Sequence, residues 1–366
     1  MRRRFPEYPM TMTIEKIIAK AATGTRINES EALTLLESRE LIAVGQAADA
    51  TRNRLLPGDD VTFVVDRNIN YTNFCITGCD FCAFHRPLGS DQGYLLSHEE
   101  IFDKIEETIE LGGTGIMMQG GLHPRLAIAY YEDLFRAIKE RYDITIHSLS
   151  PPEIHHIAKV SRLPLDQTLA RLKAAGLDSL PGGGAEILVN EVRRKMSPRK
   201  IDADTWLAVM RAAHDAGLKS TATMMFGSVE SLADRVEHLR RVRELQDETG
   251  GFRAFIPWTF QEANTGLEGT TSSSGIDYLM TLAVSRIYLD NVPSIQASWV
   301  TQGLKVAQVS LKFGVNDMGS TMIEENVVAA AGVSYRVGRD ELVAAIRAAG
   351  RRPVQRDHAY NPIDYP

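Results

Sequence analysis

Short apolar or β-branched runs alternate with longer helical patterns along the chain from about Val61 onward. This alternation is typical of βα units, in which each strand is followed by a helix that packs on the sheet. We predict eight strands, which begin at Val61, Gly115, Ile144, Gly176, Lys219, Phe252, Ser294 and Ala307. Eight parallel strands are the number that a closed (β/α)8 barrel of the TIM type needs, so the predicted fold class is α/β.

The segments between these runs carry helix start and stop signals. In "SHEEIFDKIEETIELGG", Ser97 precedes a first turn rich in Glu, and two glycines follow the last apolar position. Residues 1–55 have an amphipathic stretch of their own, "NESEALTLLES". We therefore predict a helical N-terminal extension over residues 1–55, on the bottom or flank of a barrel formed by residues 56–366, which ends in a helical cover.

Composition narrows the class of protein. The 366 residues are 44% hydrophobic and 24% charged, as in a globular protein, and the net charge of -6 argues against broad nucleic-acid binding. The basic start "MRRR" is not followed by the apolar core of a signal peptide, and no segment stays apolar for the length of a membrane span. We expect a cytoplasmic enzyme with no membrane or nucleic-acid partner.

The three cysteines of the chain, Cys75, Cys79 and Cys82, lie close together in "NFCITGCDFCAFHR". An odd number excludes a fully paired disulfide framework. Three soft thiolates at this spacing suit iron-sulfur chemistry or zinc, and His85 is placed to complete a Cys3His zinc site. With no fourth cysteine, a 4Fe-4S cluster would keep one iron open to bind and cleave a small molecule by one-electron chemistry.

The C-x3-C-x2-C spacing, with Phe81 before the last cysteine, resembles the signature of the radical S-adenosylmethionine (SAM) superfamily. The resemblance implies that the three thiolates hold a 4Fe-4S cluster and that SAM chelates the fourth iron. One electron then cleaves SAM to methionine and a 5'-deoxyadenosyl radical. Chemistry collects at the C-terminal ends of the strands in such a barrel, and the cysteines follow the first strand.

The resemblance also implies a set of SAM-binding residues. A Gly-rich turn after the second strand allows close backbone approach, and a polar residue after the fourth strand contacts SAM. The fifth-strand motif is only partly present, in "TMMFGSVE", and Ser148 departs from the usual Ala. The predicted residues are Phe81, Gln119, Gly120, Gly121, Ser148, Glu186, Arg193, Met224 and Gly227. The alternatives are a plain loop turn for the glycines, a solvated helix face for Arg193 and barrel filling for the methionines.

Several longer strings resemble one branch of the superfamily, the dehypoxanthine futalosine cyclase family of menaquinone biosynthesis. They include "NINYTNFCITGCDFCAF", "SLPGGGAEIL", "FIPWTFQ", "QASWVTQG" and "FGVNDMGSTMIEENV". Aminofutalosine synthase and the deazaflavin-forming FO synthase share the middle strings and stay open as alternatives. The resemblance implies hydrogen abstraction from the 4-prime carbon of the ribose of dehypoxanthine futalosine, attack of that carbon on the benzoate ring, and a one-electron donor such as flavodoxin or ferredoxin.

Polar and aromatic residues at the strand ends are candidates for substrate binding. They are Trp258, Gln261, Trp299, Asn316, Asp317 and Glu325. The ring-centred radical must also lose a proton, and His85 and Glu186 are candidates for the base. Recognition of the benzoate carboxylate needs a cation or several donors. Arg253 begins the sixth strand, at the end away from the mouth, and His147 lies in an alternating strand as a core residue would.

Overall fold

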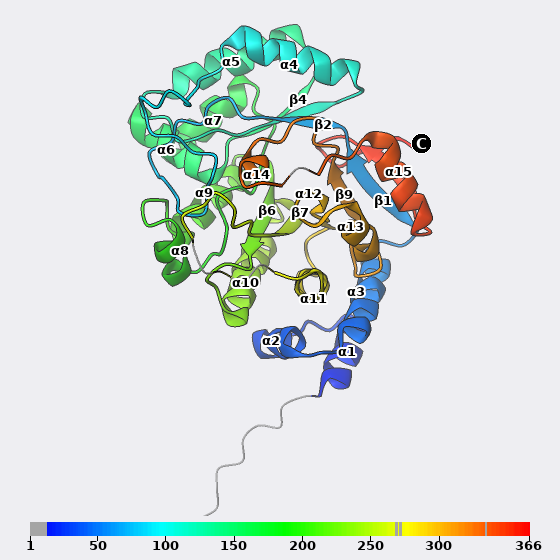
Figure 1. The fold of residues 1–366 in the computed structure, drawn as a ribbon. Coiled ribbons are helices and arrows are strands. Elements are labelled where there is room, and N and C mark those ends of the chain that lie inside the picture. Colours follow the sequence, from blue (N-terminus) through cyan, green and yellow to red (C-terminus); the bar gives the residue numbers. More distant parts are fainter. Residues whose placement is uncertain (1–12, 268–269, 271–272, 334) are drawn as a thin grey trace, which may run out of the picture.

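The computed structural model of the chain describes residues 13–267, 270, 273–333 and 335–366. Its strands are β1 (Asp60–Val64), β2 (Asp66–Ile69), β3 (Gly115–Met118), β4 (Thr145–Ser148), β5 (Ser179–Leu180), β6 (Lys219–Phe226), β7 (Phe252–Thr259), β8 (Ser294–Ile295), β9 (Asp317–Ser320), β10 (Arg352–Arg356) and β11 (Pro362–Asp364). Figure 1 shows the helices arranged around these strands.

The helices nearest the N-terminus are α1 (Ile14–Ala22), α2 (Glu29–Glu37), α3 (Leu41–Leu55), α4 (His98–Glu110), α5 (Ile128–Arg141), α6 (Pro151–Ser161), α7 (Leu165–Ala175) and α8 (Asn190–Met196). The later helices are α9 (Ala203–Asp215), α10 (Leu232–Thr249), α11 (Gly275–Tyr288), α12 (Trp299–Gln302), α13 (Leu304–Ser310), α14 (Val327–Ala330) and α15 (Arg339–Ala348). The predicted cap of α4 is present, because Ser97 and Glu100 form a reciprocal capping box.

The strands close into a parallel barrel. β2 to β8 form a seven-stranded parallel sheet in sequence order, and β1 pairs in parallel with β9. β1 and β2 are the two halves of one strand, interrupted at Val65. A parallel bridge between Gln296 and Asp317, with Ala297 N donating to Asp317 O over 2.9 Å, joins β8 to β9 and closes the ring. Counting β1 and β2 as one strand, the described residues form the predicted eight-stranded α/β barrel.

The prediction of a strand at Ala307 is wrong. The run "AQVSLKF" belongs mostly to α13, and the eighth strand of the barrel is β9, in residues expected to be a loop. Within α13 the buried positions of this run are Ala307 and Ser310, and Leu311 directly after the helix is also buried, which is the i, i+3, i+4 spacing of a helix. Because the run is short and apolar, its pattern alone does not separate helix from strand.

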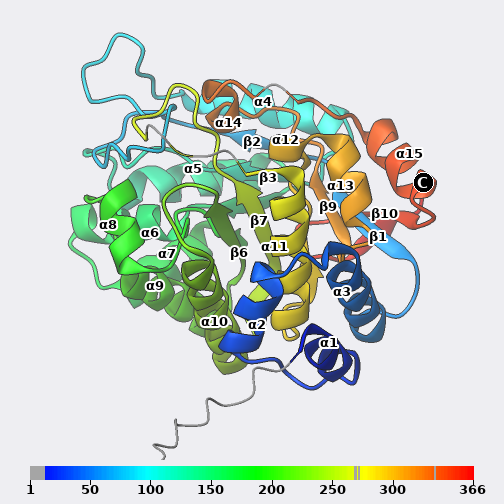
Figure 2. The ribbon, with the colours of Figure 1, turned by 60° about the horizontal axis from the view of Figure 1, so that its bottom comes forward.

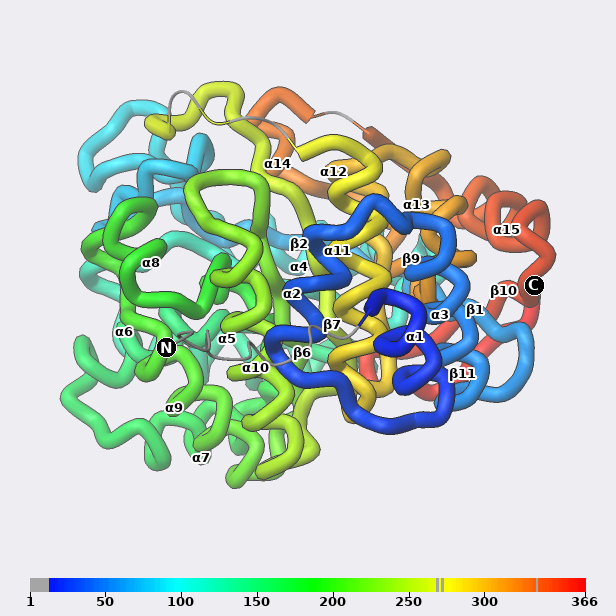
Figure 3. Tube along the Cα trace, turned by 90° about the horizontal axis from the view of Figure 1, so that it is seen from below, coloured from blue at the N-terminus to red at the C-terminus, as the bar shows by residue number. Residues whose placement is uncertain are grey.

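The N-terminal helices lie on the flank of the barrel. α2 packs against α10 and α11, and α3 packs along α11 (Figures 2 and 3). Arg26, between α1 and α2, pairs with Asp247 at 2.6 Å and with Asp290 at 2.9 Å. The predicted extension therefore covers the side of the barrel from residue 13 onward, and residues 1–12 lie outside the described residues.

The C-terminal segment is only partly the helical cover that we predicted. α15 is followed by β10, which pairs in parallel with β1 on the edge opposite β9, and by β11, which pairs antiparallel with β10. Beyond β10 the chain runs under the barrel, where His358 packs so closely on Gly115 that a Cβ there would lie 2.1 Å from its ring. The C-terminal segment thus forms the floor of the barrel.

No helix in the described part of the chain combines the length and apolar character needed to span a bilayer.

Candidate active site

The three cysteines lie in the loop between β2 and α4, beside the loop that follows β7 (Figure 2). Neighbouring segments fix this loop through its backbone: Asp80 N donates to Met196 O over 3.0 Å, and Arg199 Nε donates to Thr77 O over 2.8 Å. The Thr77 hydroxyl lies 2.9 Å from Cys75 Sγ and 3.6 Å from Cys79 Sγ. One hydroxyl therefore brings the first two thiols together at the mouth.

The surroundings of the thiols differ in their effect on ionisation. Burial raises the pKa of Cys79, and the charge of Lys200 partly offsets this. Burial also raises the pKa of Cys82, but hydrogen bonds from His85 and Phe84 outweigh it, so the pKa of Cys82 is lowered overall. The hydrogen bond with Cys82 in turn raises the pKa of His85. Cations beside these thiols favour the thiolate form that binds metal.

The described residues do not form a preassembled site for a single metal ion, because no three of their His, Cys, Asp or Glu side chains converge closely enough to hold one. A cavity of about 280 Å³ is lined by Cys79, Cys82 and His85, next to Asn264 and Gly266 of the β7 loop. Two of the three thiols line this cavity, and the Thr77 hydroxyl links the third, Cys75, to Cys79. A cubane binds its thiolates at separate corners, which suits thiols grouped in this way.

The glycine turn after β3 packs directly on the cysteine loop. A Cβ on Gly121 would lie 2.3 Å from Phe74 O and 2.8 Å from Cys75 Cβ, and one on Gly120 would meet the ring of Tyr71 at 2.7 Å. Buried Glu153 holds this turn, because Gly120 N and the Tyr71 hydroxyl both donate to it, over 3.0 and 2.8 Å. The two glycines are therefore required for close packing at this place, whatever they contact besides.

A buried charge network lies next to Cys79. Glu186, in a left-handed conformation (φ +40°), accepts from Lys200 Nζ over 3.0 Å and lies 3.7 Å from Arg193. Glu186 Oε2 is buried with no hydrogen-bond partner in the described chain. Leu149 and Met322 also have positive φ, so backbone strain recurs where strands end at the mouth. Arg193 Nη1, at 3.7 Å from this oxygen, is too far to donate a hydrogen bond, so the oxygen can still accept one from a ligand amino or hydroxyl group.

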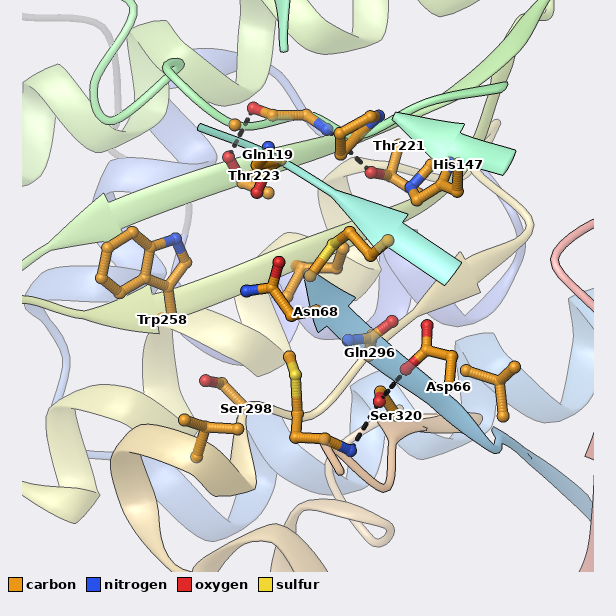
Figure 4. A pocket seen from close by; sticks show the side chains of 18 of the residues that line it. Asp66, Asn68, Gln119, His147, Thr221, Thr223, Trp258, Gln296, Ser298 and Ser320 are labelled. Atoms are coloured by element: carbon orange, nitrogen blue, oxygen red, sulfur yellow. Dashed lines mark hydrogen bonds between the residues drawn. The ribbon is translucent and has the colours of Figure 1, made fainter. Parts of the chain in front are cut away.

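Below the mouth, a cavity of about 250 Å³ extends into the barrel (Figure 4). Polar side chains line it at alternate positions of the strands, as residues that share one face of a strand must. These polar residues include Asp66, Asn68, Gln119, His147, Ser179, Thr221, Thr223, Gln296, Ser298 and Ser320. In Figure 4 Trp258 lies at one end of the cavity, and His147 and Asp66 lie toward the other end.

The deep end of the cavity carries most of its charged groups. Asp66 accepts from the Ser320 hydroxyl and lies 3.0 Å from His358 Nε2. Arg356 pairs with Asp317 through two contacts of 2.5 and 3.1 Å. The structure therefore places two carboxylates, each with a nitrogen-bearing side chain beside it, at the floor of the barrel.

His147 also lies at this end, with its Nδ1 2.7 Å from Ser179 Oγ. Burial lowers the pKa of His147 well below its ordinary value, and the nearby His358, Arg253 and Arg356 lower it further. At neutral pH the imidazole is therefore uncharged. Its interpretation as a plain core residue is incomplete, because it lines the cavity.

Four of the predicted ligand-binding residues lie on the wall of this cavity: Gln119, Trp258, Trp299 and Glu325. Trp299 Nε1 donates to Ser320 O over 2.9 Å, so its ring is fixed. Glu325 caps α14 by accepting from Val327, Val328 and Ala329, and its burial raises its pKa. Phe81 lies beside the cysteines, with Lys200 Nζ 5.1 Å from its ring centre.

Other predicted residues do not lie on the cavity wall. Ser148 is fully buried and donates to Met118 O, and Met224 is core. Gln261 donates to Thr259, while Asn316 and Asp317 are held by Arg286 and Arg356 in the barrel wall. Arg193 is a buried anchor that donates to the carbonyls of residues 184, 185, 187 and 201 and is not on a solvated face. Gly227 N donates to Glu230 over 2.6 Å in a turn with positive φ.

The polar strand residues of the cavity were missing from the sequence-based candidates. Asp66 and Asn68, like Thr221 and Thr223, are spaced two apart and line the cavity. Residues spaced two apart in a strand share one face, which in a barrel can be the interior. Arg67 and Ser220 are polar as well, so neither strand has a clean alternation, and the sequence pattern does not mark the face that lines the cavity.

Family comparisons agree with this arrangement. Residues 69–242 match the Radical SAM superfamily, and residues 249–366 match the CofH/MqnC C-terminal region. The chain is 48% identical over 353 residues to a protein of Halalkalibacterium halodurans named cyclic dehypoxanthine futalosine synthase, covering 96% of this chain and 95% of that protein. The chain belongs to the radical SAM superfamily. The cofactors of this superfamily, a 4Fe-4S cluster and SAM, are therefore those of the enzyme.

Other relatives of this radical SAM enzyme have different names. A Streptomyces coelicolor protein, also named cyclic dehypoxanthine futalosine synthase, is 46% identical and covers 96% of this chain and 89% of its own length. The aminodeoxyfutalosine synthase of Thermus thermophilus is 40% identical, with 95% of both chains covered. A 5-amino-6-(D-ribitylamino)uracil--L-tyrosine 4-hydroxyphenyl transferase of Methanococcoides burtonii is 42% identical, covering 96% of this chain and 100% of its own.

Two solved structures of more distant proteins have the same fold. Methylornithine synthase matches with a TM-score of 0.71 at 20% identity, over 92% of this chain and 97% of its own. The FeFe-hydrogenase maturase of Carboxydothermus hydrogenoformans matches with a TM-score of 0.75 at 19% identity, over 95% and 80%. The predicted radical SAM barrel is thus confirmed, and the partner of its site is a small-molecule substrate.

Proposed function

We propose that the protein is a cyclic dehypoxanthine futalosine synthase of the futalosine pathway to menaquinone. In this reaction hydrogen leaves the 4-prime carbon of the ribose of dehypoxanthine futalosine, and that carbon attacks the benzoate ring to close a spiro ring. The observation that carries the proposal is the similarity, at 48% and 46% identity over nearly the whole chain, to two proteins with that name.

The sister activities are supported less well. The relatives named aminodeoxyfutalosine synthase and hydroxyphenyl transferase are 40% and 42% identical, below both cyclase-named relatives. Because all these proteins cover the same length of chain, the difference in identity does not come from an added or missing domain. The cyclase is therefore the first choice among related reactions.

The mouth residues suit the cofactors of such a reaction. Cys75, Cys79 and Cys82 are the predicted ligands of the cluster, and with SAM bound the cluster supplies a 5'-deoxyadenosyl radical after one-electron reduction. Glu186 presents an unpartnered buried oxygen beside Cys79, in the position that we predict for a SAM contact. Lys200 keeps the local charge balanced by pairing with Glu186 at 3.0 Å.

The cavity supplies confinement. A reactive alkyl radical abstracts hydrogen from many groups, so the ribose carbon must be held in contact with it and other donors kept away. Trp258 and Trp299 give rigid walls near the mouth, and the polar strand residues below them offer partners for ribose hydroxyls. A small one-electron carrier such as flavodoxin or ferredoxin would deliver the electron from outside.

The experiment is a three-way assay with the anaerobically reconstituted protein, SAM and dithionite. Dehypoxanthine futalosine should give a product two hydrogen atoms lighter, together with 5'-deoxyadenosine. Parallel reactions contain an enolpyruvyl benzoate, or tyrosine with 5-amino-6-(D-ribitylamino)uracil. Turnover of either alternative, without cyclisation of dehypoxanthine futalosine, contradicts the proposal in favour of that sister activity.

A further inference from the structure

Arg253 differs from Arg356, the other arginine of the cavity lining, in having no carboxylate among the described residues paired with it. Its Nη1 donates to the main-chain oxygen of His358 over 2.9 Å, and it makes no ion pair with any carboxylate in the described part of the chain. Arg356, the other cavity-lining arginine, is fully engaged by Asp317. Arg253 is therefore the cavity cation whose charge is not matched by a carboxylate.

A half-buried cation without a partner is a costly arrangement. Burial lowers the pKa of Arg253, although a guanidinium stays protonated at neutral pH. The planar guanidinium still has donors free, and in this geometry a carboxylate is its best partner. An anionic ligand group at this end of the cavity would remove the cost.

The position of Arg253 suits the carboxylate end of an aryl ketone substrate. Arg253 is the second residue of β7, and Trp258 lies near the mouth end of the same strand. The two are about 16 Å apart along the strand at a rise of ~3.3 Å per residue. The ribose must lie near the mouth, where the cysteines are, so the benzoate points down the barrel. Cyclisation requires the linker to fold so that the benzoate ring lies near the ribose. In this arrangement the carboxylate of the ring is directed away from the mouth.

We propose that the deep end of the cavity is a carboxylate subsite in which the Arg253 guanidinium binds the benzoate of the substrate and His147 Nε2 donates a second hydrogen bond. This rests on the proposed function, because that function supplies the benzoate. His147 lines the cavity, and its Nδ1 lies 2.7 Å from Ser179 Oγ. When the Ser179 hydroxyl donates to Nδ1, the ring proton is on Nε2, which can then donate to the carboxylate. A neutral imidazole adds a donor without adding a second positive charge.

The test measures binding of acetylbenzoate and of the matching acetylbenzamide to the full-length protein, by calorimetry or ligand-observed NMR. Arg253→Gln should weaken acetylbenzoate binding by about 10- to 100-fold and the neutral amide by much less. Arg253→Lys should recover part of the difference, because it restores the charge without the planar donor pair. The matched control is Arg243→Gln, since Arg243 donates to Ile27 O over 2.9 Å outside the cavity.

Two results overturn the subsite. Equal weakening of both probes by Arg253→Gln means that the residue only supports the floor through His358, and unchanged acetylbenzoate binding means that the carboxylate lies elsewhere. The three-way assay separates this question from the function. A protein that binds acetylbenzoate through Arg253 but does not cyclise dehypoxanthine futalosine keeps the subsite and loses the proposed function, and the reverse pattern loses only the subsite.

Discussion

The two ends of the barrel are built in different ways. At the mouth, the three cysteines come from one short loop, which Thr77 and backbone hydrogen bonds shape locally. At the floor, groups far apart in the chain meet, as Asp66 and His358 do at 3.0 Å. The comparison teaches that the residues predicted to bind the cofactor can lie in one contiguous motif. The floor of the substrate cavity, in contrast, is built from residues near both ends of the chain.

The largest predicted effect comes from a substitution that removes a cluster ligand at the mouth and does not change the floor. Cys79→Ala should abolish cluster assembly and all 5'-deoxyadenosine formation, since two thiolates cannot replace the three that hold the cluster. Iron content, the visible absorption spectrum and product analysis measure this. The far-UV circular dichroism spectrum should match that of the parent protein, and retained turnover would refute the ligand assignment.

The next effect weakens the floor. Asp317→Asn leaves the buried Arg356 without its carboxylate and should lower the free energy of unfolding by about 3–5 kcal/mol. Urea unfolding of the apo-protein measures it. The matched control is Asp340→Asn, which breaks an exposed ion pair at 3.8 Å and should cost less than about 1 kcal/mol. Similar losses in both variants would mean that the Arg356–Asp317 pair does not hold the floor.

Acidification should lower the free energy of unfolding, because two largely buried histidines are uncharged in the folded protein. His238 accepts from Leu188 N over 3.1 Å behind the Glu186 loop, and burial lowers its pKa to about 3. Burial likewise lowers the pKa of His214 to about 4. The unfolded chain binds these protons near pH 6.5 and the folded chain does not, so stability is highest above pH 6.5. It should fall by up to about 1.4 kcal/mol per pH unit for each histidine as the pH drops toward 3–4.

Unfolding curves between pH 7 and 4.5 test this slope. His238→Gln should make the decline shallower, because the glutamine has no proton to gain. His98→Gln, a change at the start of α4, serves as the control for losing a histidine. An unchanged slope in the His238 variant would show that other groups govern the acid response.

The smallest effect concerns the wall between the two ends. Trp258→Phe keeps an aromatic wall but removes part of its area, so we expect KM for the substrate to rise by about 2- to 10-fold with little change in kcat. Steady-state kinetics with dehypoxanthine futalosine measure the split. A fall in kcat with unchanged KM would instead give the ring a role in positioning the reacting ribose.

The predictability of the molecule follows the same division. The alternation of strands and helices and the capping signals are local, so the barrel and the cap at Ser97 could be predicted from the sequence. The spacing of the cysteines likewise predicted where the mouth lies. The eighth strand was misplaced because a seven-residue apolar run has no decisive period. Pairing of β10 with β1 depends on contacts between opposite ends of the chain, which no local pattern encodes.

Individual residues show the same limit. Asn316 and Asp317 were predicted to bind the substrate, but they lie in the barrel wall with Arg286 and Arg356, partners that the sequence does not reveal. Whether a polar strand residue faces the cavity or the wall depends on register, and an error of one residue exchanges the two faces. Arg253 was not predicted to bind the substrate carboxylate, because it lies at the end of its strand away from the mouth. The cavity extends to that end, so Arg253 lines it.

The floor formed by the C-terminal segment has a kinetic consequence. The cavity lining includes three residues of this segment, Arg356, His358 and Tyr360. The segment therefore closes the lower end of the barrel, and ligands must enter and leave through the mouth. SAM bound at the cysteine loop would then stand in the path of the substrate. We expect compulsory-order kinetics, in which dehypoxanthine futalosine enters first, SAM follows, and the fragments of SAM depart before the cyclised product can leave.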